Sequence, residues 1–298
     1  MLLSTLKNAV GRLRSIEERT KKIQEALGRI EARQLRDTPV ADIHGAEFRV
    51  FSQWGEDGVL QHLLRHVPIS KKVFVEFGVE NYTECNTRFL LVNGSWAGLV
   101  IDGSAKNIDF IRQDEIYWRY NLKADCAFIT RENINDLIRQ NGIAGEIGLL
   151  SIDIDGNDYW VWEAIDVATP SLVVIEYNAR FGPGRALTVP YDPAFVRTTA
   201  HYSNIYYGAS LAALCLLAKR KGYCFVGCNT AGVNAFFVRE DLRPSALPEL
   251  TAAEGFVPLK FRESRTAQGA LAFLTTEQEA DILNQLPLVD VSQAVVSS

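Results

Sequence analysis

The sequence lacks three features that would each indicate a class of protein. The 298-residue chain has a formal net charge of −5, whereas contacts to nucleic-acid phosphates need a basic surface, so we expect no nucleic-acid partner. No apolar run approaches the length that crosses a bilayer, so we expect no transmembrane segment. The Gly-x-Gly-x-x-Gly fingerprint of dinucleotide-binding domains is also missing, which disfavours an NAD(P)-dependent oxidoreductase.

The cysteines do not indicate a disulfide framework. Their number is odd, and they are scattered through segments that we expect to form core strands and helices: Cys85, Cys126, Cys215, Cys224 and Cys228. This usage is typical of a reducing compartment. The N-terminus begins Met-Leu-Leu but becomes charged at once, unlike a secretory signal, so we expect a cytoplasmic protein.

Residues 1–35 repeat every seven residues. Leu6, Leu13, Thr20 and Leu27 form one series, and Ala9, Ile16, Ile23 and Ile30 form a second series between them. A sustained repeat of seven predicts a coiled coil, and a leucine series followed by an isoleucine series favours three or four helices. We therefore expect self-association as a trimer or tetramer. The alternative is a single helix that lies on its own domain.

From Lys72 the sequence alternates between apolar strands and helical segments. Strands are expected at 73–78, 98–102, 126–129, 147–153 and 172–177, and a helix at 210–221 leads into a hairpin at 223–227 and 233–238. Alternation of this kind requires a parallel sheet with helices on both faces, and the hairpin adds an antiparallel strand. We predict an α/β domain over residues 45–240. A C-terminal extension, 241–298, carries one helix with Thr276 as its cap.

Acids and glycines follow the strands of this domain at the same edge. The first strand ends at Gly78, the second at Asp102 and the fourth at Asp153. In open α/β sheets that edge binds nucleotide-like ligands. An acid that closes the second strand can accept hydrogen bonds from both hydroxyls of a ribose. The pattern therefore predicts a cofactor site and an enzyme.

Five motifs, in this order and spacing, resemble FkbM-like class I S-adenosylmethionine-dependent methyltransferases, a bacterial group associated with surface-polysaccharide synthesis: Ser52-Gln-x-Gly-Glu-Asp57, Val75-Glu-Phe-Gly78, Ile101-Asp102-Gly103, Leu150-Ser-Ile-Asp-Ile-Asp-Gly156 and Ile175-Glu-Tyr-Asn178. The resemblance covers residues 48–240. It implies a Rossmann-like, seven-stranded mixed sheet and S-adenosylmethionine as cofactor. One departure is the first loop, which has a single glycine, Gly78, where the family carries two or three.

The resemblance also implies cofactor-binding residues. Glu76 and Gly78 would face the methionine and ribose portion, Asp102 and Gly103 would bind the ribose, and Thr130 would lie at the start of the helix after the third strand. Two alternatives stay open. Gly78 could serve only the bend of the chain, and Asp102 could form a salt bridge with a neighbouring Lys or Arg.

Polar residues at the ends of the fourth and fifth strands should converge, because adjacent parallel strands lie about 5 Å apart. Asp153, Glu176 and Asn178 offer hard oxygen ligands suited to Mg²⁺ or a similar cation, which would lower the pKa of a sugar hydroxyl. Without a metal, Asp153 would act directly as general base. As an alternative, Asp155-Gly156-Asn157 also has the pattern of a turn and helix cap.

The long loop after the fifth strand supplies the expected acceptor site. His201 could take the substrate proton, and Arg180, Arg185, Tyr191, Tyr206 and Tyr207 suit an acidic or sugar-containing acceptor. We predict an O-methyltransferase that acts on a sugar hydroxyl of a glycan or nucleotide-sugar intermediate, peripheral to the inner membrane. Besides the oxidoreductase, the alternative is a non-catalytic oligomeric scaffold with a degenerate methyltransferase domain.

Overall fold

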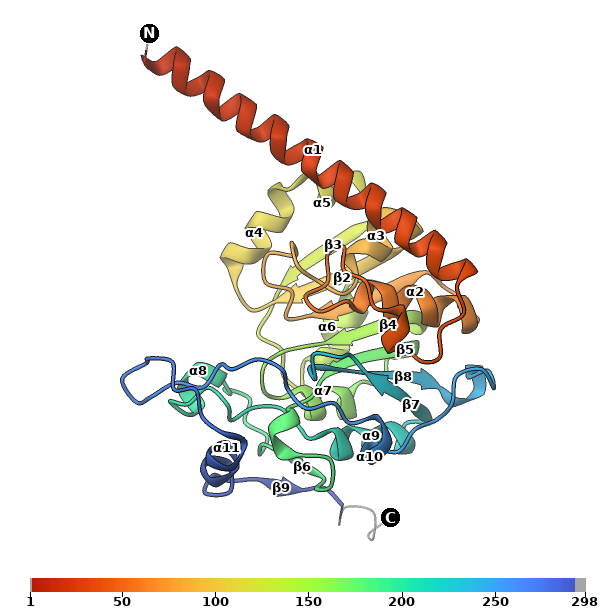
Figure 1. The fold of residues 1–298 in the computed structure, drawn as a ribbon, viewed down its shortest axis with the longest axis vertical. Helices are drawn as coiled ribbons and strands as arrows, with labels where there is room; N and C mark the ends of the chain where they lie inside the picture. The colour runs from red at the N-terminus through yellow and green to blue at the C-terminus, as the bar shows by residue number, and fades with distance from the viewer. Residues whose placement is uncertain (1, 293–298) are drawn as a thin grey trace.

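The computed structural model describes residues 2–292, and a seven-stranded sheet forms its centre (Figure 1). The strand order is β3-β2-β1-β4-β5-β8-β7. The first five strands are parallel, and β8 runs antiparallel to both β5 and β7. The strands are β1 (Val73–Phe77), β2 (Ala97–Asp102), β3 (Leu122–Cys126), β4 (Gly145–Ile152), β5 (Ala168–Glu176), β7 (Tyr223–Cys228) and β8 (Asn234–Arg239). The predicted fold class, a Rossmann-like sheet of class I methyltransferase type, is confirmed.

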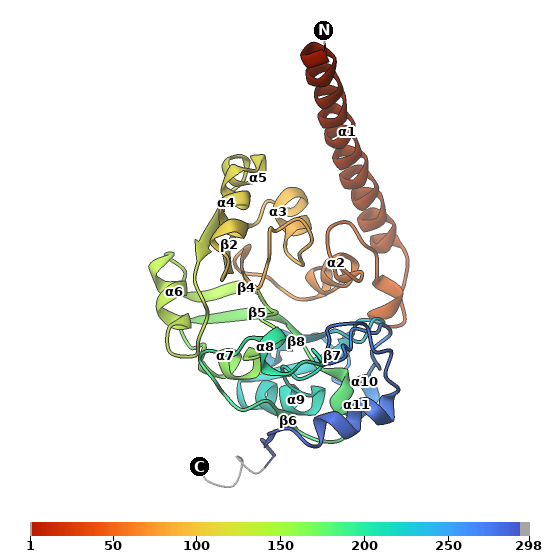
Figure 2. The same ribbon diagram turned by 90° about the vertical axis from the view of Figure 1, so that its left-hand side faces the viewer.

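Helices cover both faces of the sheet, because side chains that alternate along each strand are apolar on both sides (Figure 2). On β1, Phe74 packs on one side, while Val75 and Phe77 pack on the other. The first face is covered by α2 (Glu56–His66), α3 (Arg88–Gly94), α4 (Ala105–Gln113) and α5 (Glu115–Arg119). The second face is covered by α6 (Ile134–Gln140), α7 (Asp158–Ala164) and α9 (Leu211–Arg220).

Two predicted boundaries were wrong. The third strand was expected at 126–129 but lies at Leu122–Cys126, where Leu122 and Ala124 are buried and Lys123 between them is exposed. The apolar run 127–129 that suggested a strand instead lines a cavity at the end of β3. In the extension, helix α11 (Thr276–Leu283) is capped by Thr275, which forms a capping box with Gln278, rather than by Thr276.

The C-terminal extension packs against the loop that follows β5. Its strand β9 (Val289–Asp290) pairs with β6 (Leu187–Thr188) of that loop. Arg180, in the 3-10 helix that follows β5, forms a salt bridge with Glu279 on α11, with Nε and Oε1 3.1 Å apart. The remaining short elements are α8 (Arg197–Ala200), α10 (Ala252–Gly255) and the 3-10 helices η1 (His44–Ala46), η2 (Ala179–Phe181) and η3 (Glu240–Leu242).

The N-terminal helix α1 (Leu2–Asp37) rests on the domain with its C-terminal half. Gly28 and Ala32 approach Val50 and Phe89, and the side chain of Gln24 donates to the backbone carbonyl of Val50. The N-terminal half projects beyond the α/β domain in both views (Figures 1 and 2). Over residues 2–292, no helix combines the length and apolar character that a membrane span requires.

The fit of α1 against the domain depends on the missing side chain at Gly28. A Cβ atom there would lie 2.5 Å from Cγ2 of Val50, whereas at Gly11 it would meet nothing within 4 Å. Gly→Ala substitution favours an exposed helix by about 0.5–1 kcal/mol. We therefore expect Gly11→Ala to increase helicity, and Gly28→Ala to lower the free energy of unfolding by about 1–3 kcal/mol through overpacking. Urea unfolding and circular dichroism of the two variants check this. Equal changes in the free energy of unfolding for Gly11→Ala and Gly28→Ala would contradict the close packing at Gly28.

Candidate functional site

A cavity of about 440 Å³ opens at the carboxyl edge of the sheet, beside the ends of β1, β2, β4 and β5. The strand order reverses between β1 and β4, so this is the topological switch point at which open α/β sheets bind ligands. Gly78 follows β1, Asp102 ends β2, Asp153 follows β4 and Glu176 ends β5, and all four line the cavity. The structure therefore brings these four predicted residues together.

Gly78 lies where the loops after β1 and β4 cross. Its φ is +70°, and a Cβ atom there would lie 1.5 Å from the backbone oxygen of Asp153. No side chain fits in that space, so glycine is required for the bend of the chain. Because the same residue lines the cavity, the bend and a close approach of backbone to a ligand are compatible roles.

Glu76 does not line the cavity but holds the loop after β1 from beneath. Its carboxylate accepts hydrogen bonds from the backbone nitrogens of Asn86 (2.9 Å) and Thr87 (3.2 Å), and from the hydroxyl of Ser151 (3.2 Å). Burial raises the pKa of Glu76 to about 7, against these hydrogen bonds, which lower it. The prediction that Glu76 faces the cofactor is therefore not matched by its position, since its oxygens are directed into the loop.

The loop after β1 makes tight turns without further glycines. Glu80 and Tyr82 both have positive φ values, 46° and 61°. Such values are uncommon outside glycine and persist where the surroundings hold them. Here the backbone nitrogen of Glu80 donates to Asp102, and the backbone carbonyl of Tyr82 accepts from the guanidinium of Arg88. The tight turns of this loop are therefore made by residues other than glycine, which hydrogen bonds hold in place.

Asp102 connects the first two loops at the cavity. Its Oδ2 accepts from the backbone nitrogen of Glu80 (2.8 Å), and its Oδ1 accepts from the backbone nitrogen of Ser104 (2.8 Å) and from the side chain of Asn107 (3.1 Å). Within residues 2–292 Asp102 forms no salt bridge, so the alternative role as an ion-pair partner is not what the structure shows. A carboxylate oxygen can accept two hydrogen bonds, so Oδ2 keeps capacity for a ligand hydroxyl.

Apolar groups form the wall beyond Asp102. Ile101, Gly103, Ala127, Phe128 and Ile129 line this part of the cavity. The ring of Phe128 is half exposed and lies 3.6 Å from the position that a Cβ of Gly103 would occupy. Thr130 lies just outside this wall: its hydroxyl accepts from the backbone nitrogen of Asn133, the residue that caps α6. Its hydrogen bonds with Asn133 support the turn that leads into that helix.

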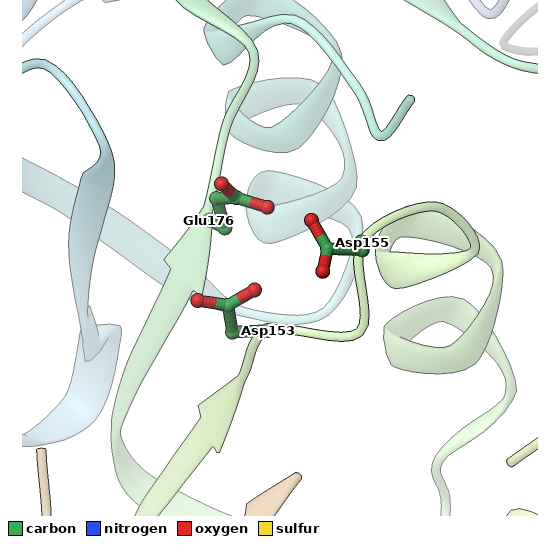
Figure 3. A group of neighbouring side chains, drawn as sticks. All are labelled: Asp153, Asp155 and Glu176. Atoms are coloured by element: carbon green, nitrogen blue, oxygen red, sulfur yellow. The ribbon is translucent and has the colours of Figure 1, made fainter. Parts of the chain in front are cut away.

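Three carboxylates converge at the other end of the cavity, Asp153, Asp155 and Glu176 (Figure 3). One oxygen of each lies within 4.8 Å of the others. Glu176 is buried, and among the side chains and backbone that the structure describes its Oε2 has no hydrogen-bond partner. Burial, and then the neighbouring acids, raise the pKa values of Asp153 and Glu176 well above their ordinary range. Carboxyl groups so close together share protons or bind a cation.

Asp155 is held in place by an arginine that we did not predict as a site residue. Nη1 of Arg197, at the start of α8, lies 2.5 Å from Oδ1 of Asp155, and its Nη2 lies 2.6 Å from Oε2 of Glu263 in the C-terminal extension. The guanidinium stacks over the ring of Tyr207, 3.8 Å from its centroid. The side chain of Arg197 therefore connects the acid cluster with two distant parts of the chain.

Asn178 is not part of the acid cluster. Its amide nitrogen donates to the carbonyls of Ile205 (2.9 Å) and Tyr207 (3.1 Å), and its side-chain oxygen accepts from the backbone nitrogen of Arg180. These bonds hold the long loop after β5. They also use the side-chain oxygen of Asn178, which was the predicted metal ligand. Asp155 takes the third place in the set instead.

His201 also lies away from the cavity. Its Nδ1 is 2.6 Å from the hydroxyl of Ser203, its ring packs beside that of Tyr202, and partial burial lowers its pKa. It is not among the residues that line the cavity, so the structure does not place it for proton transfer. Arg180 and Arg185 are directed to α11, where they contact Glu279 and Asn284.

The turn after β4 is built around Asp158. Its two carboxylate oxygens accept from the backbone nitrogens of Ile154 (2.8 Å) and Gly156 (2.9 Å). Asp155 within the turn has a positive φ of 55°. The predicted turn and the acid cluster are therefore both present, because Asp158 forms the turn that presents Asp153 and Asp155. Asn157 occupies the N-cap position of α7, but its side chain forms no capping hydrogen bond there.

A second hollow of about 310 Å³ adjoins the main cavity and shares Asp155, Phe195, Arg197 and other residues with it. Phe128 and Phe195 supply apolar rings, and Asn204, Glu263 and Arg265 supply polar groups. A larger cavity of about 600 Å³ lies elsewhere, between the segment after α1 and β7. It contains none of the predicted site residues, so the cavity at the switch point is the candidate site.

No family model and no curated protein matches the chain. Among solved structures, the chain is similar to a S-adenosylmethionine-dependent methyltransferase from Clostridium acetobutylicum, at 9% identity over 61% of this chain and 89% of that one, with a TM-score of 0.39. It is similar to a candidate caffeoyl-CoA O-methyltransferase from Staphylococcus aureus, at 14% identity over 69% and 88%, with a TM-score of 0.40. An O-methyltransferase from Bacillus cereus gives 14% identity over 56% and 72%, with a TM-score of 0.36.

Glu76 gives a test of how the loop after β1 is held. Glu76→Gln removes one acceptor oxygen and should leave a buried backbone N–H unpaired, which costs about 1–3 kcal/mol. The folded-state pKa, about 7, exceeds the ordinary value of 4.5, so the stability that wild-type Glu76 contributes falls as the pH rises through this range. We expect Glu76→Gln to lower the free energy of unfolding more at pH 5 than at pH 8.

Urea unfolding at both pH values measures this difference. Glu115→Gln on the exposed surface of α5 serves as the matched control; it loses only a half-exposed ion pair with Arg119, so it should change both values much less than Glu76→Gln does. A Glu76→Gln variant as stable as the wild type at pH 5 would show that the carboxyl group of Glu76 does not support the loop.

Proposed function

We propose that the chain is an S-adenosylmethionine-dependent O-methyltransferase. The observation that carries the proposal is one continuous cavity at the switch point of the sheet, with Asp102 toward one end and the acid cluster of Asp153, Asp155 and Glu176 at the other. The first group is suited to a ribose, and the second is suited to the chemistry of a hydroxyl. Sugar-containing acceptors of surface-polysaccharide synthesis, which the sequence motifs suggest, are part of the same proposal.

The chain fits the cofactor at three points. The free capacity of Asp102 Oδ2 suits a ribose hydroxyl, and the half-exposed ring of Phe128 suits stacking with a purine. The tight bend at Gly78 permits the backbone to approach the amino-acid portion. S-adenosylmethionine bound in this way would supply an electrophilic methyl group. The work of the chain is to orient the acceptor oxygen toward it and to exclude competing water.

The acid cluster supplies the proton acceptor. The raised pKa values of Asp153 and Glu176 mean that these two acids retain a proton more readily than ordinary carboxylic acids do. When ionised, Asp153 is a stronger base than an exposed aspartate, so it can take the proton from a hydroxyl that is placed beside it. Arg197 fixes Asp155 next to this pair and thereby sets the charge of the cluster.

The same donors fit a divalent cation. Three carboxylate oxygens within 4.8 Å of one another and an unpartnered, buried Glu176 Oε2 form a hard oxygen set. Asp153, Asp155 and Glu176 would hold the cation, in place of the predicted set with Asn178. A bound cation would lower the pKa of the acceptor hydroxyl. The general-base mechanism and the cation-dependent mechanism use the same residues, but only the second should be inhibited by a chelator.

The second hollow suits the acceptor. Phe128 and Phe195 offer ring faces to the apolar face of a sugar, while Asn204, Glu263 and Arg265 offer hydrogen bonds to its hydroxyls. Arg197 is already paired with two acids and covers Tyr207. Because its charge is neutralised by these acids, we favour a neutral sugar over a strongly acidic acceptor.

Asp102 provides the test of cofactor binding. Asp102→Ala should weaken the binding of S-adenosylhomocysteine by about 1–3 kcal/mol, because a buried polar contact is lost, and because the loop at Glu80 loses its anchor. Isothermal titration calorimetry measures the change, with Asp109→Ala on the exposed side of α4 as control. If wild-type protein binds NADH but not S-adenosylmethionine, the proposal fails, and unchanged affinity in a folded Asp102→Ala variant removes that residue from the site.

The acid cluster provides the test of chemistry. Asp153→Asn should reduce methyl transfer to an oligosaccharide acceptor by about 10²–10⁴-fold, the range for loss of a general base, while S-adenosylhomocysteine still binds. Asp109→Asn should retain full activity. Turnover in excess EDTA then separates the general-base mechanism from the cation-dependent one. If a cation is needed, EDTA should abolish turnover, and added Mg²⁺ or Mn²⁺ should restore it. Wild-type turnover by Asp153→Asn would overturn both.

A further inference from the structure

The apolar seam of α1 remains exposed in the folded chain. Leu13, Ile16, Ile23, Leu27 and Ile30 expose between 48% and 65% of their surface. Thr20, the polar member of the seam, donates its hydroxyl to the backbone carbonyl of Ile16 and so needs no other partner. Exposed apolar rows of this length mark a surface that another chain covers.

The domain cannot cover this seam, because it packs on another side of the same helix. The residues that approach the domain are Lys21, Gln24, Gly28 and Ala32, whereas the seam residues of the same turns, Ile23, Leu27 and Ile30, are exposed. In the heptad, Leu13 and Leu27 are at position a, and Ile16, Ile23 and Ile30 are at position d. The residues that contact the domain are at positions b, e and f. One side of α1 therefore packs on the domain, and the side with the a and d residues faces solvent.

We propose that the seam binds the same seam of further copies of this chain, as a parallel bundle of three or four helices. The occupant is a second copy because the seven-residue repeat of a coiled coil must be matched by its partner, and α1 itself carries that repeat. Leucine at a and isoleucine at d favours more than two helices. This inference does not depend on the proposed methyl transfer.

The charges beside the seam specify the parallel orientation. Arg12 and Arg19 are at g positions, Glu17 is at an e position, and all three are exposed. In a parallel bundle, g of one helix faces e five residues later on its neighbour, so Arg12 meets Glu17 of the next copy. In an antiparallel arrangement g faces g, which sets Arg12 and Arg19 against arginines. The parallel bundle places all the α/β domains at one end, around its outside.

The oligomer is tested on the full-length protein by size-exclusion chromatography with light scattering. We expect a trimer or tetramer for the wild type, and monomers for Ile23→Asp, because a buried charge in the seam is unpaired. Lys22→Asp, one residue away on the exposed helix surface, should keep the oligomer. Thermal unfolding confirms that the domain of each variant is folded. A monomeric wild type, or an Ile23→Asp protein that remains oligomeric, would overturn the proposal.

Orientation is tested by reversing charges. Arg12→Glu and Glu17→Arg alone should each raise the concentration at which the oligomer dissociates by about twofold or more, and the double variant should restore it. Only a parallel register predicts this rescue. Additive losses in the double variant would exclude the parallel bundle even if the protein is oligomeric.

Discussion

Buried carboxylates that accept backbone N–H groups hold the carboxyl edge of this sheet together. Asp57 binds the nitrogens of three consecutive residues, 50–52, at 2.6–2.8 Å. Glu76 holds the loop after β1, Asp102 connects that loop to the one after β2, and Asp158 forms the turn after β4. A buried acid without such partners would be costly. The positions of the acid cluster and of the apolar wall beyond Asp102 both depend on these four anchors, so the geometry of the site is set mainly by residues beneath it.

The sequence was sufficient for the fold and for part of the site, and the reason is periodicity. Strands and helices have regular spacing, and parallel strands end at a common edge, which is why Asp102, Asp153 and Glu176 could be assigned to one site. Contacts that join distant segments have no such signal. Arg197 is 42 residues from its partner Asp155 and 66 from Glu263, and nothing local marks it. Glu76, Asn178 and His201 share the polar chemistry of site residues, but packing directs them to backbone groups or loops.

The first loop has a single glycine, Gly78, where the family that the sequence resembles carries two or three. The structure shows how the loop manages without further glycines. Backbone at Glu80 and Tyr82 takes up the left-handed conformation, and hydrogen bonds to Asp102 and Arg88 offset its strain. The loop is therefore more constrained than a glycine-rich one would be, because its conformation is fixed before any ligand binds. Such preorganisation reduces the entropy that binding must overcome.

The main cavity is lined by seven carboxylate side chains and one guanidinium: Glu80, Glu84, Asp102, Asp153, Asp155, Glu176 and Glu263, with Arg197. A site with that excess of acids attracts positive charge. In the proposed reaction the methyl donor is a sulfonium cation and the product is an uncharged thioether. Transfer thus removes the charge that the cavity attracts. The acidic cavity should therefore bind S-adenosylhomocysteine less tightly than S-adenosylmethionine. This difference would limit product inhibition without any movement of the chain.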